Sequence, residues 1–398
     1  MPEAVLQSRY RQAIALHGKG DADAAEALYR GILAEMPESF HTLHMLGVLL
    51  AQRDELDESA RLIGEAVRID PSVAAAQANL GNTLRLLDRT DEAMAAYGRA
   101  LRLQPDNERA LKGRGLILWQ TGHREAALAC YEHLLSVKPD YADGWIMKAA
   151  ALNHLGRNDE SIACYRKALE FESASDPAKI HYMLAALGAE PPPAASPIEY
   201  VRDLFDKYAR RFDAHLVNSL HYRGPQLMIE ALGACIADTP LDIVDLGCGT
   251  GLCGPLLKPW ARSLAGMDLS PRMVEEARRK GVYDELVAGE IVTWLATQPA
   301  RFDLLVAADV LIYFGDLTPV FAAAHAAARP GALFGFTTER SDGDDIVLNS
   351  SMRFAHSENY LCRLAEANGW AVVSNAQCEL RKEKDIGVAS TVTILRRC

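Results

Sequence analysis

The sequence lacks the features that would place it among disulfide-rich, secreted or membrane proteins. Its eight cysteines include no Cys-x-x-Cys pair, so we expect reduced thiols in a reducing compartment. No apolar run approaches the roughly 18 residues that cross a bilayer. The start, Met1 to Ala4, has neither the basic nor the apolar region of a signal peptide. We therefore expect a soluble, cytoplasmic protein.

A surplus of basic residues is also absent. The formal net charge of -11 argues against a nucleic-acid partner, because counterion release needs clustered lysine and arginine. Cys248 and Cys253 lie five positions apart around a glycine loop, and we expect packing residues there rather than metal ligands. The 398 residues, 49% of them apolar, exceed what one hydrophobic core usually supports, which favours two globular domains.

An internal repeat occupies the first half of the chain. Pro37, Pro71, Pro105 and Pro139 follow one another at intervals of 34 residues. Before each proline, and once more after the last one, a small residue is followed four positions later by a larger residue. The pairs are Ala25 and Tyr29, Ser59 and Ile63, Ala93 and Tyr97, Ala127 and Tyr131, and Ser161 and Tyr165.

This pattern resembles tetratricopeptide repeats, in which small residues let paired helices approach and a proline ends the second helix. The resemblance covers residues 6–175, about five repeats. It implies an α-solenoid over residues 1–188, with an amphipathic capping helix over 177–187. Turns between paired helices are expected at Gly20, Asp54, Asp88, Gly122 and Gly156.

The first helices of such repeats line a concave groove. Two interpretations of the groove stay open: it binds an extended peptide or other partner, or it is a solvated scaffold. No dense basic or acidic cluster is apparent, so the charge of a ligand is not predicted. The resemblance assigns to the groove His44, Asn82, Arg85, Lys112, Trp119, Asn153 and His154.

A proline-rich segment, residues 189–197, disfavours helix and is predicted to link two domains. From Leu241 onward, short apolar segments alternate with helical ones, which predicts a parallel sheet covered on both faces. The last two segments are joined by a loop, which predicts an antiparallel hairpin. The seven predicted strands are 241–246, 263–268, 285–290, 302–308, 332–338, 370–377 and 390–395.

A glycine-rich turn, Asp245 to Gly251, follows the first of these strands. Such a turn lets backbone approach a ligand closely. Asp268 ends the second strand, where a carboxylate can accept hydrogen bonds from both ribose hydroxyls. Glu290 ends the third and is placed to meet an adenine amino group. Together these residues predict a nucleoside site at the carboxyl edge of the sheet.

Over residues 198–398 this constellation resembles class I S-adenosylmethionine-dependent methyltransferases, which have a Rossmann-like fold. The resemblance implies S-adenosylmethionine as cofactor and S-adenosylhomocysteine as product. It implies that Asp245 orients the ammonium group and that Leu269 packs on the adenine. The residues that it assigns to the cofactor are Asp245, Gly247, Cys248, Gly249, Gly251, Asp268, Leu269, Glu290 and Asp309.

The glycine-rich turn admits two other interpretations. Gly249, Gly251 and Gly254 also fit the Gly-x-Gly-x-x-Gly spacing of NAD-dependent oxidoreductases. Asp245 just before the loop, the start at Gly247 and the terminal hairpin argue against that class. A structural turn without a ligand is disfavoured because successive strand ends carry acids or glycines.

Residues outside the loop are candidates for closing the site. In this family the segment before the first strand folds over the cofactor, which makes Tyr208, Phe212 and Tyr222 candidate lid residues. Arg223 is a candidate partner for a carboxylate. Part of the lid segment, residues 208–216, is rich in aromatic and charged side chains.

The acceptor and any base are less well defined. After the fourth strand there is no Asn-Pro-Pro-Tyr segment, which argues against methylation of nucleic-acid bases or amides and favours small molecules, carboxylates or hydroxyls. Tyr313 and Glu339 lie past strands four and five, where the acceptor is expected. His356 is a candidate general base, although a capping role for His356 and Ser357 is the alternative.

The two halves support two classes of function. In one, the chain is a methyltransferase whose repeats recruit a protein substrate or carrier, or form oligomers while a small-molecule acceptor enters independently. In the other, it is an assembly protein that binds the cofactor without turnover. The acceptor and the groove's partner are not specified by the sequence.

Overall fold

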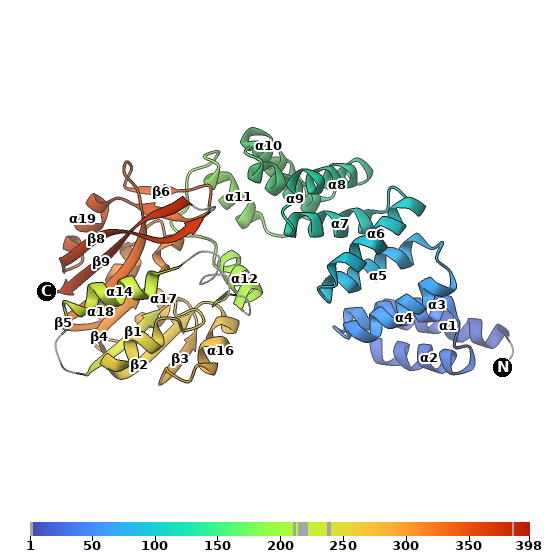
Figure 1. Cartoon of the computed structure of the whole chain (residues 1–398), viewed down its shortest axis with the longest axis horizontal. Helices are drawn as coiled ribbons and strands as arrows, with labels where there is room; N and C mark the ends of the chain where they lie inside the picture. Colours follow the sequence, from blue (N-terminus) through green and yellow to red (C-terminus); the bar gives the residue numbers. More distant parts are fainter. Residues whose placement is uncertain (1–2, 210–211, 214–221, 237–239, 384–385) are drawn as a thin grey trace. The chain divides into compact units, whose positions relative to one another are not determined.

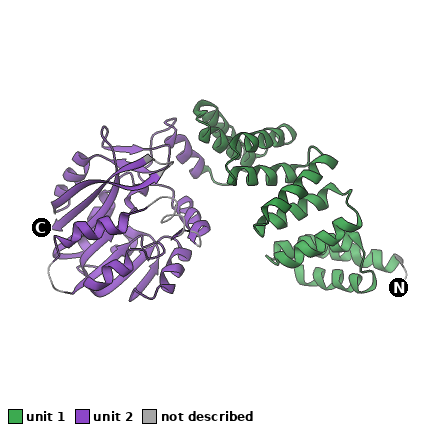
Figure 2. Cartoon of the chain, in the orientation of Figure 1, with its two compact units in different colours: residues 1–177 green, residues 178–398 purple. Residues whose placement is uncertain are grey.

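The computed structural model describes residues 3–209, 212–213, 222–236, 240–383 and 386–398. The chain divides into two compact units, Met1–Pro177 and Ala178–Cys398 (Figure 2). This division falls ahead of the predicted linker at residues 189–197. As limits of independently folding domains, the predicted boundaries remain a prediction.

The first unit consists of helices joined by short turns (Figure 1). Successive helices pair, and each pair packs on the next. The helices are α1 (Glu3–Gly18), α2 (Ala22–Glu35), α3 (Phe40–Gln52), α4 (Leu56–Ile69), α5 (Ala74–Leu86), α6 (Thr90–Leu103), α7 (Glu108–Gln120), α8 (Arg124–Val137), α9 (Ala142–His154) and α10 (Asn158–Leu169).

The repeat pattern accounts for these helices. Pro37, Pro71, Pro105 and Pro139 each lie two residues after an even-numbered helix, where proline cannot continue a helix. The five predicted turn residues all have positive φ angles, from 57° at Asp88 to 83° at Gly20 and Gly122.

Small residues allow the close helix approach that the repeats require. Tyr97 is buried, and its Oη donates to Oδ1 of Asn82 at 2.6 Å. A Cβ on Gly81 would lie 2.7 Å from the Tyr97 ring, and one on Gly113 would lie 2.2 Å from its Oη. Alanine at either glycine would therefore collide with the tyrosine that joins two repeats.

The second unit begins with α11 (Pro177–Ala186), the helix that we predicted to cap the repeats. Buried Tyr182 of this helix forms hydrogen bonds of 2.7 Å to Oγ of Ser196 and to the carbonyl of Met352. These contacts attach α11 to the second unit. They also give the buried hydroxyl of Tyr182 the hydrogen-bond partners that it would otherwise lack.

A nine-stranded sheet forms the centre of the second unit, in the order β3-β2-β1-β4-β5-β7-β6, with β9 paired to β5 and β8 to β9 (Figure 1). The strands are β1 (Leu241–Leu246), β2 (Ala261–Asp268), β3 (Glu285–Ala288), β4 (Phe302–Ala307), β5 (Ala328–Arg340), β6 (Ile346–Leu348), β7 (Phe354–His356), β8 (Trp370–Glu383) and β9 (Ile386–Arg397).

The topology agrees with the predicted fold class. Pairing is parallel along β3-β2-β1-β4-β5-β7, whereas β6, β8 and β9 pair antiparallel. The predicted hairpin is β8 and β9. Seven strands were predicted, and β6 and β7 were missed because each has only three residues, too few to show an alternating pattern.

Two hydrophobic cores cover the sheet, one on each face. Ile243 and Leu304 belong to one core, and their neighbours Val244 and Leu305 to the other. The remaining helices are α12 (Ile198–Tyr208), α14 (Gly224–Gly233), α15 (Gly254–Leu257), η2 (Lys258–Trp260), α16 (Pro271–Arg279), α17 (Ile291–Leu295), η3 (Leu311–Tyr313), α18 (Thr318–Ala327) and α19 (Glu358–Ala367). None of the described helices is both long and apolar enough to cross a membrane.

Candidate active site

A cavity of about 470 Å³ opens where β1, β2 and β4 end. This is the carboxyl edge of a parallel sheet, the usual place for ligands in open α/β folds. Its walls come from these strand ends, from α12 and from the region around η3. The polar and charged lining residues are Ser196, Tyr208, Tyr222, Asp245, Asp268, Glu290, Asp309, Tyr313, Arg353 and Arg381.

The glycine turn contributes backbone to the cavity. Gly247 and Gly249 line it with φ angles of 66° and 53°. A Cβ on Gly247 would lie 2.3 Å from Cγ2 of Val310, so this position requires glycine in both conformation and space. Cys248 lies between them and also lines the cavity.

Gly251 has a packing role in the turn. Its φ is 85°, and a Cβ there would lie 2.9 Å from the Tyr283 ring and 3.4 Å from Cβ of Ala277. Gly251 therefore allows the turn to pack closely against α16. It is not among the residues that line the cavity, and its contact with the cofactor stays a prediction.

Asp268 is held at the end of β2 with a defined orientation. It is 8% exposed, and its two carboxylate oxygens accept from the backbone N–H groups of Gly249 at 2.9 Å and Ser270 at 2.8 Å. Burial raises its pKa to about 6, against the lowering effect of these hydrogen bonds. Each oxygen retains a lone pair for a ligand hydroxyl.

Asp245 is almost fully buried beneath the turn. Its Oδ2 accepts from the hydroxyl of Tyr283 at 2.6 Å. Burial raises the pKa of Asp245 to about 7, and the nearby carboxylate of Asp268 contributes. A cationic group of a ligand in the cavity would favour the ionised form.

Glu290 lines the cavity, but its carboxylate caps α17. The backbone N–H groups of Val292 and Thr293 donate to it at 3.3 and 3.0 Å, and the hydroxyl of Thr293 also donates. The Glu290 carboxylate is therefore a helix N-cap, and its contact with an adenine amino group stays a prediction. Leu269 also lines the cavity, and its packing on the adenine stays a prediction.

A buried ion network closes the end of β4. Asp309 has a positive φ of 61°, and its Oδ1 accepts from Nη1 of Arg381 at 2.6 Å. The other Arg381 nitrogen, Nη2, donates to Glu339, and Arg353 lies 3.8 Å from the same carboxylate. The Arg381 side chain is 1% exposed, so two carboxylates compensate a guanidinium removed from water.

Aromatic rings from α12, from η3 and from Phe212 also line the cavity. The Phe205 ring lies 5.6 Å from that of Tyr313 and 6.0 Å from that of Phe212, and Tyr208 contacts Phe212 at 5.5 Å, between ring centroids. Tyr222 lines the cavity too, and burial raises its pKa well above the ordinary value. Residues 210–211 and 214–216 of the predicted lid segment lie outside the described residues.

Two predicted catalytic residues lie elsewhere. Arg223 is exposed, is the N-cap residue of α14 and does not line the cavity. His356 is buried in β7, and its Nε2 lies 3.0 Å from the carbonyl of Gly315. Burial lowers the pKa of His356 to about 4, and Ser357 caps α19 by accepting from the Tyr360 N–H. Ser357 therefore has the capping role that the alternative predicted, and neither Arg223 nor His356 is among the residues that line the cavity.

Part of the cavity wall was not predicted from the sequence. Ile198, Val201, Leu204 and Phe205 line the cavity from α12, and their spacing of three to four residues is the signal of an amphipathic helix. Arg381 carried no such signal, since 72 residues separate it from Asp309.

The cavity fits the predicted nucleoside cofactor. A Cβ on Gly249 would lie 3.7 Å from the Phe212 ring. Because glycine has no Cβ, the space between the turn and this ring stays open. Asp268 presents ordered acceptors for hydroxyls, and Asp245 presents an acid for a cationic group. Leu269 and Ile291 supply apolar wall.

Family models match both parts of the chain. A methyltransferase-domain model matches residues 243–331, and models of the tetratricopeptide repeat match residues 81–122 and 112–178. S-adenosylmethionine, the cofactor predicted from the glycine turn, is the methyl donor that this methyltransferase family uses.

Curated relatives match the second unit. A malonyl-[acyl-carrier protein] O-methyltransferase from Pseudescherichia vulneris is 28% identical over 134 residues, 34% of this chain and 51% of that protein. A ubiquinone biosynthesis O-methyltransferase from Xylella fastidiosa is 27% identical over 168 residues, 37% of this chain and 68% of that protein. The chain spans about half or less of the length of the first curated relatives it matches.

Solved structures are also similar to parts of the chain. A 1,6-didemethyltoxoflavin-N1-methyltransferase from Burkholderia thailandensis is 22% identical with a TM-score of 0.43, covering 52% of this chain and 93% of that one. MamA is 26% identical with a TM-score of 0.38, covering 40% and 92%. By its family matches, the chain combines tetratricopeptide repeats in its N-terminal unit with a methyltransferase domain in its C-terminal unit.

Proposed function

We propose that the chain transfers a methyl group from S-adenosylmethionine to a small, largely apolar acceptor. The observation that carries the proposal is a single cavity that joins two kinds of wall. The glycine turn and Asp268 form one kind of wall, and the aromatic rings of Phe205, Phe212 and Tyr313 form the other.

The proposed roles follow from these contacts. Asp268 would hold the ribose hydroxyls, Asp245 the ammonium group, and the turn at Gly247 and Gly249 the methionine part. When bound, the cofactor supplies an electrophilic methyl group for in-line displacement. Such a reaction depends on positioning and on excluding water, which the aromatic wall would provide.

The acceptor atom is proposed to be oxygen. The two relatives described above are named O-methyltransferases. Asp309 and the hydroxyl groups of Tyr222 and Tyr313 are among the polar groups that line the cavity. These groups suit a hydroxyl or carboxyl acceptor on an apolar body, because they can orient one polar end while rings pack on the rest.

Parallel calorimetric titrations test the cofactor. The full chain should bind S-adenosylmethionine and S-adenosylhomocysteine and should show no heat with NAD. Binding of NAD alone would overturn the proposal in favour of the oxidoreductase alternative. If neither sulfur compound binds, the domain has no donor site.

An assembly protein that binds the cofactor without turnover is the second candidate function. Tetratricopeptide repeats, which serve protein interaction, support it. Transfer of labelled methyl from the cofactor to a panel of phenols and carboxylic acids separates the two. Labelled product supports the enzyme, whereas tight binding without transfer to any acceptor supports the assembly protein.

The titration of Asp245 leads to a pH prediction. Its pKa is about 7 in the ligand-free chain, and a bound ammonium group would lower it. Binding should therefore release protons near pH 7, and affinity for S-adenosylhomocysteine should fall as the pH drops from about 8 to about 6, approaching tenfold per unit for one ionising group.

Calorimetry in two buffers of different ionisation enthalpy counts these protons. Asp245→Asn should bind more weakly at pH 8 and lose most of the pH dependence. Asp203→Asn, on the exposed side of α12, is the matched control and should behave like the parent chain. An unchanged proton count in Asp245→Asn would show that another group responds to the ligand.

A further inference from the structure

A carboxylate of α12 contacts a residue that orients Asp268. Oδ1 of Asp206 accepts a hydrogen bond from Oγ of Ser270, and the backbone N–H of Arg272 donates to the same oxygen at 3.5 Å. Ser270 is fully buried at the start of α16, and its own backbone N–H donates to Oδ1 of Asp268 at 2.8 Å. Two hydrogen bonds therefore lead from Asp206 through one buried serine to Asp268.

A second carboxylate has a similar relation to the glycine turn. Oδ1 of Asp213 accepts from Oγ1 of Thr250, and Oδ2 accepts from Nζ of Lys280 at 2.8 Å. Thr250 is 2% exposed and follows Gly249, whose N–H donates to the other oxygen of Asp268 at 2.9 Å. Neither Asp206 nor Asp213 is among the residues that line the cavity, so both act on the site through the residues that they hold.

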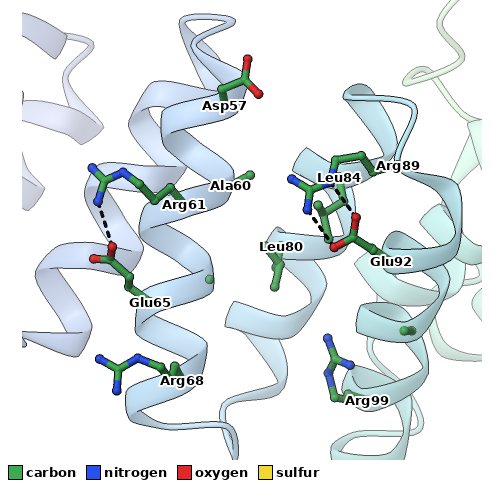
Figure 3. A pocket seen from close by; sticks show the side chains of 12 residues that line it. Asp57, Ala60, Arg61, Glu65, Arg68, Leu80, Leu84, Arg89, Glu92 and Arg99 are labelled. Atoms are coloured by element: carbon green, nitrogen blue, oxygen red, sulfur yellow. Dashed lines mark hydrogen bonds and ion pairs between the residues drawn. The ribbon is translucent and has the colours of Figure 1, made fainter.

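These contacts differ from ordinary surface ion pairs of the chain. In a cavity of the repeat unit, Arg61 pairs with Glu65 within α4 and Arg89 pairs with Glu92 within α6 (Figure 3). All four side chains are at least 41% exposed, and such local pairs contribute little to stability. The two acids near the glycine turn instead accept from buried hydroxyls 64 and 37 residues away in sequence. A buried hydroxyl that loses its partner is costly.

Asp206 also acts on Asp268 through its charge. Burial is the largest cause that raises the pKa of Asp268 to about 6, the backbone hydrogen bonds oppose it, and the carboxylate of Asp206 raises it further. The other ionisable groups that face Asp268 are the carboxyl of Asp245 on β1 and the thiol of Cys248 in the turn. A change at Asp206 should therefore be detectable at Asp268 itself, even without a ligand.

We propose that Asp206 and Asp213 are positioning residues of the cofactor site, which hold Ser270 and Thr250 so that the oxygens of Asp268 meet the ribose hydroxyls. The inference rests on the proposed function for the identity of the ligand. The part of the chain that carries the two acids also supplies apolar wall to the cavity, from α12 and the residue before Asp213. The contacts would therefore order the polar and the apolar wall together.

Calorimetric titration of the full chain with S-adenosylhomocysteine tests the positioning. At about pH 8 the acids of the site, with pKa values near 6 and 7, are largely ionised. Asp206→Ala and Asp213→Ala should each weaken binding about three- to tenfold, because a buried hydroxyl loses its acceptor. Asp206→Asn and Asp213→Asn keep an acceptor oxygen and should bind within about threefold of the parent chain. Asp203→Ala, at an exposed acid of α12 that pairs with Lys207, is the matched control and should bind like the parent.

A titration of the ligand-free chain separates an effect on Asp268 from general support of α12. The carboxyl carbon of Asp268 is followed by carbon-13 NMR and assigned with Asp268→Asn. In Asp206→Asn the pKa of Asp268 should fall below the parent value of about 6, because a nearby negative charge is removed while the side chain keeps its shape. Asp203→Asn changes the net charge equally and should leave this pKa at the parent value.

Four outcomes would overturn the proposal. They are an unchanged pKa of Asp268 in Asp206→Asn, unchanged affinity in the two alanine variants, an equal loss in Asp203→Ala, and asparagine variants that bind as weakly as the alanine variants. Circular dichroism checks folding, and if an alanine variant does not fold, its asparagine counterpart and the titration of Asp268 still decide. If the parent chain does not bind S-adenosylhomocysteine, the proposed function fails, whereas the ligand-free titration still shows whether Asp206 acts on Asp268.

Discussion

Replacing Arg381 with methionine should destabilise the second unit by about 3–5 kcal/mol, the cost of breaking a buried ion network on one side. The guanidinium is 1% exposed and joins Asp309 on β4 to Glu339 on β5. Without it the partly buried Asp309 and the buried Glu339 would lose the guanidinium that they share, and Arg353, 3.8 Å from Glu339, would compensate only part of the charge. Hydrogen exchange of the β5 and β8 amides measures the effect locally in this unit.

Two further variants make the Arg381 prediction specific. Arg363→Met removes an exposed ion pair with Asp345, whose side chains are 61% and 50% exposed, and should cost no more than about 1 kcal/mol. Adding Asp309→Asn and Glu339→Gln to Arg381→Met should recover much of the loss, because no buried charge is then left unpaired. A loss below about 1 kcal/mol in the single variant would mean that the network is hydrated in solution.

Replacing Asp268 with alanine should weaken the binding of S-adenosylhomocysteine by about 1–3 kcal/mol, or roughly 5- to 150-fold. The change removes the acceptors proposed for the ribose hydroxyls. It also leaves the N–H groups of Gly249 and Ser270 without their present partner. Calorimetric titration of the full chain measures the loss.

Asp268→Asn separates the two contributions. An amide keeps one acceptor oxygen and the shape of the side chain, so it should support the turn better than alanine while still binding the cofactor weakly. Asp203→Asn again serves as the matched exposed control. Cofactor affinity that is unchanged in Asp268→Ala would refute the assignment of the ribose site.

Much of the fold could be predicted because its signals are local. The 34-residue spacing of the prolines marks the helix ends of the repeat unit, and the turn residues have the positive φ angles expected of them. In the second unit, the alternation of short apolar segments with helices predicted the parallel sheet and the terminal hairpin. The glycine turn and Asp268 meet in one cavity because strand ends of a parallel sheet share an edge.

The sequence by itself therefore determined the two architectures and the donor end of the candidate site. Only the tertiary structure decided which charges are compensated and which side chains reach the cavities. It buried Arg381 between two acids, made the Glu290 carboxylate the N-cap of α17, and placed His356 and Arg223 outside the residues that line the cavity. Periodicity reports which face of a helix or strand is buried, but contacts between distant segments depend on how whole elements pack.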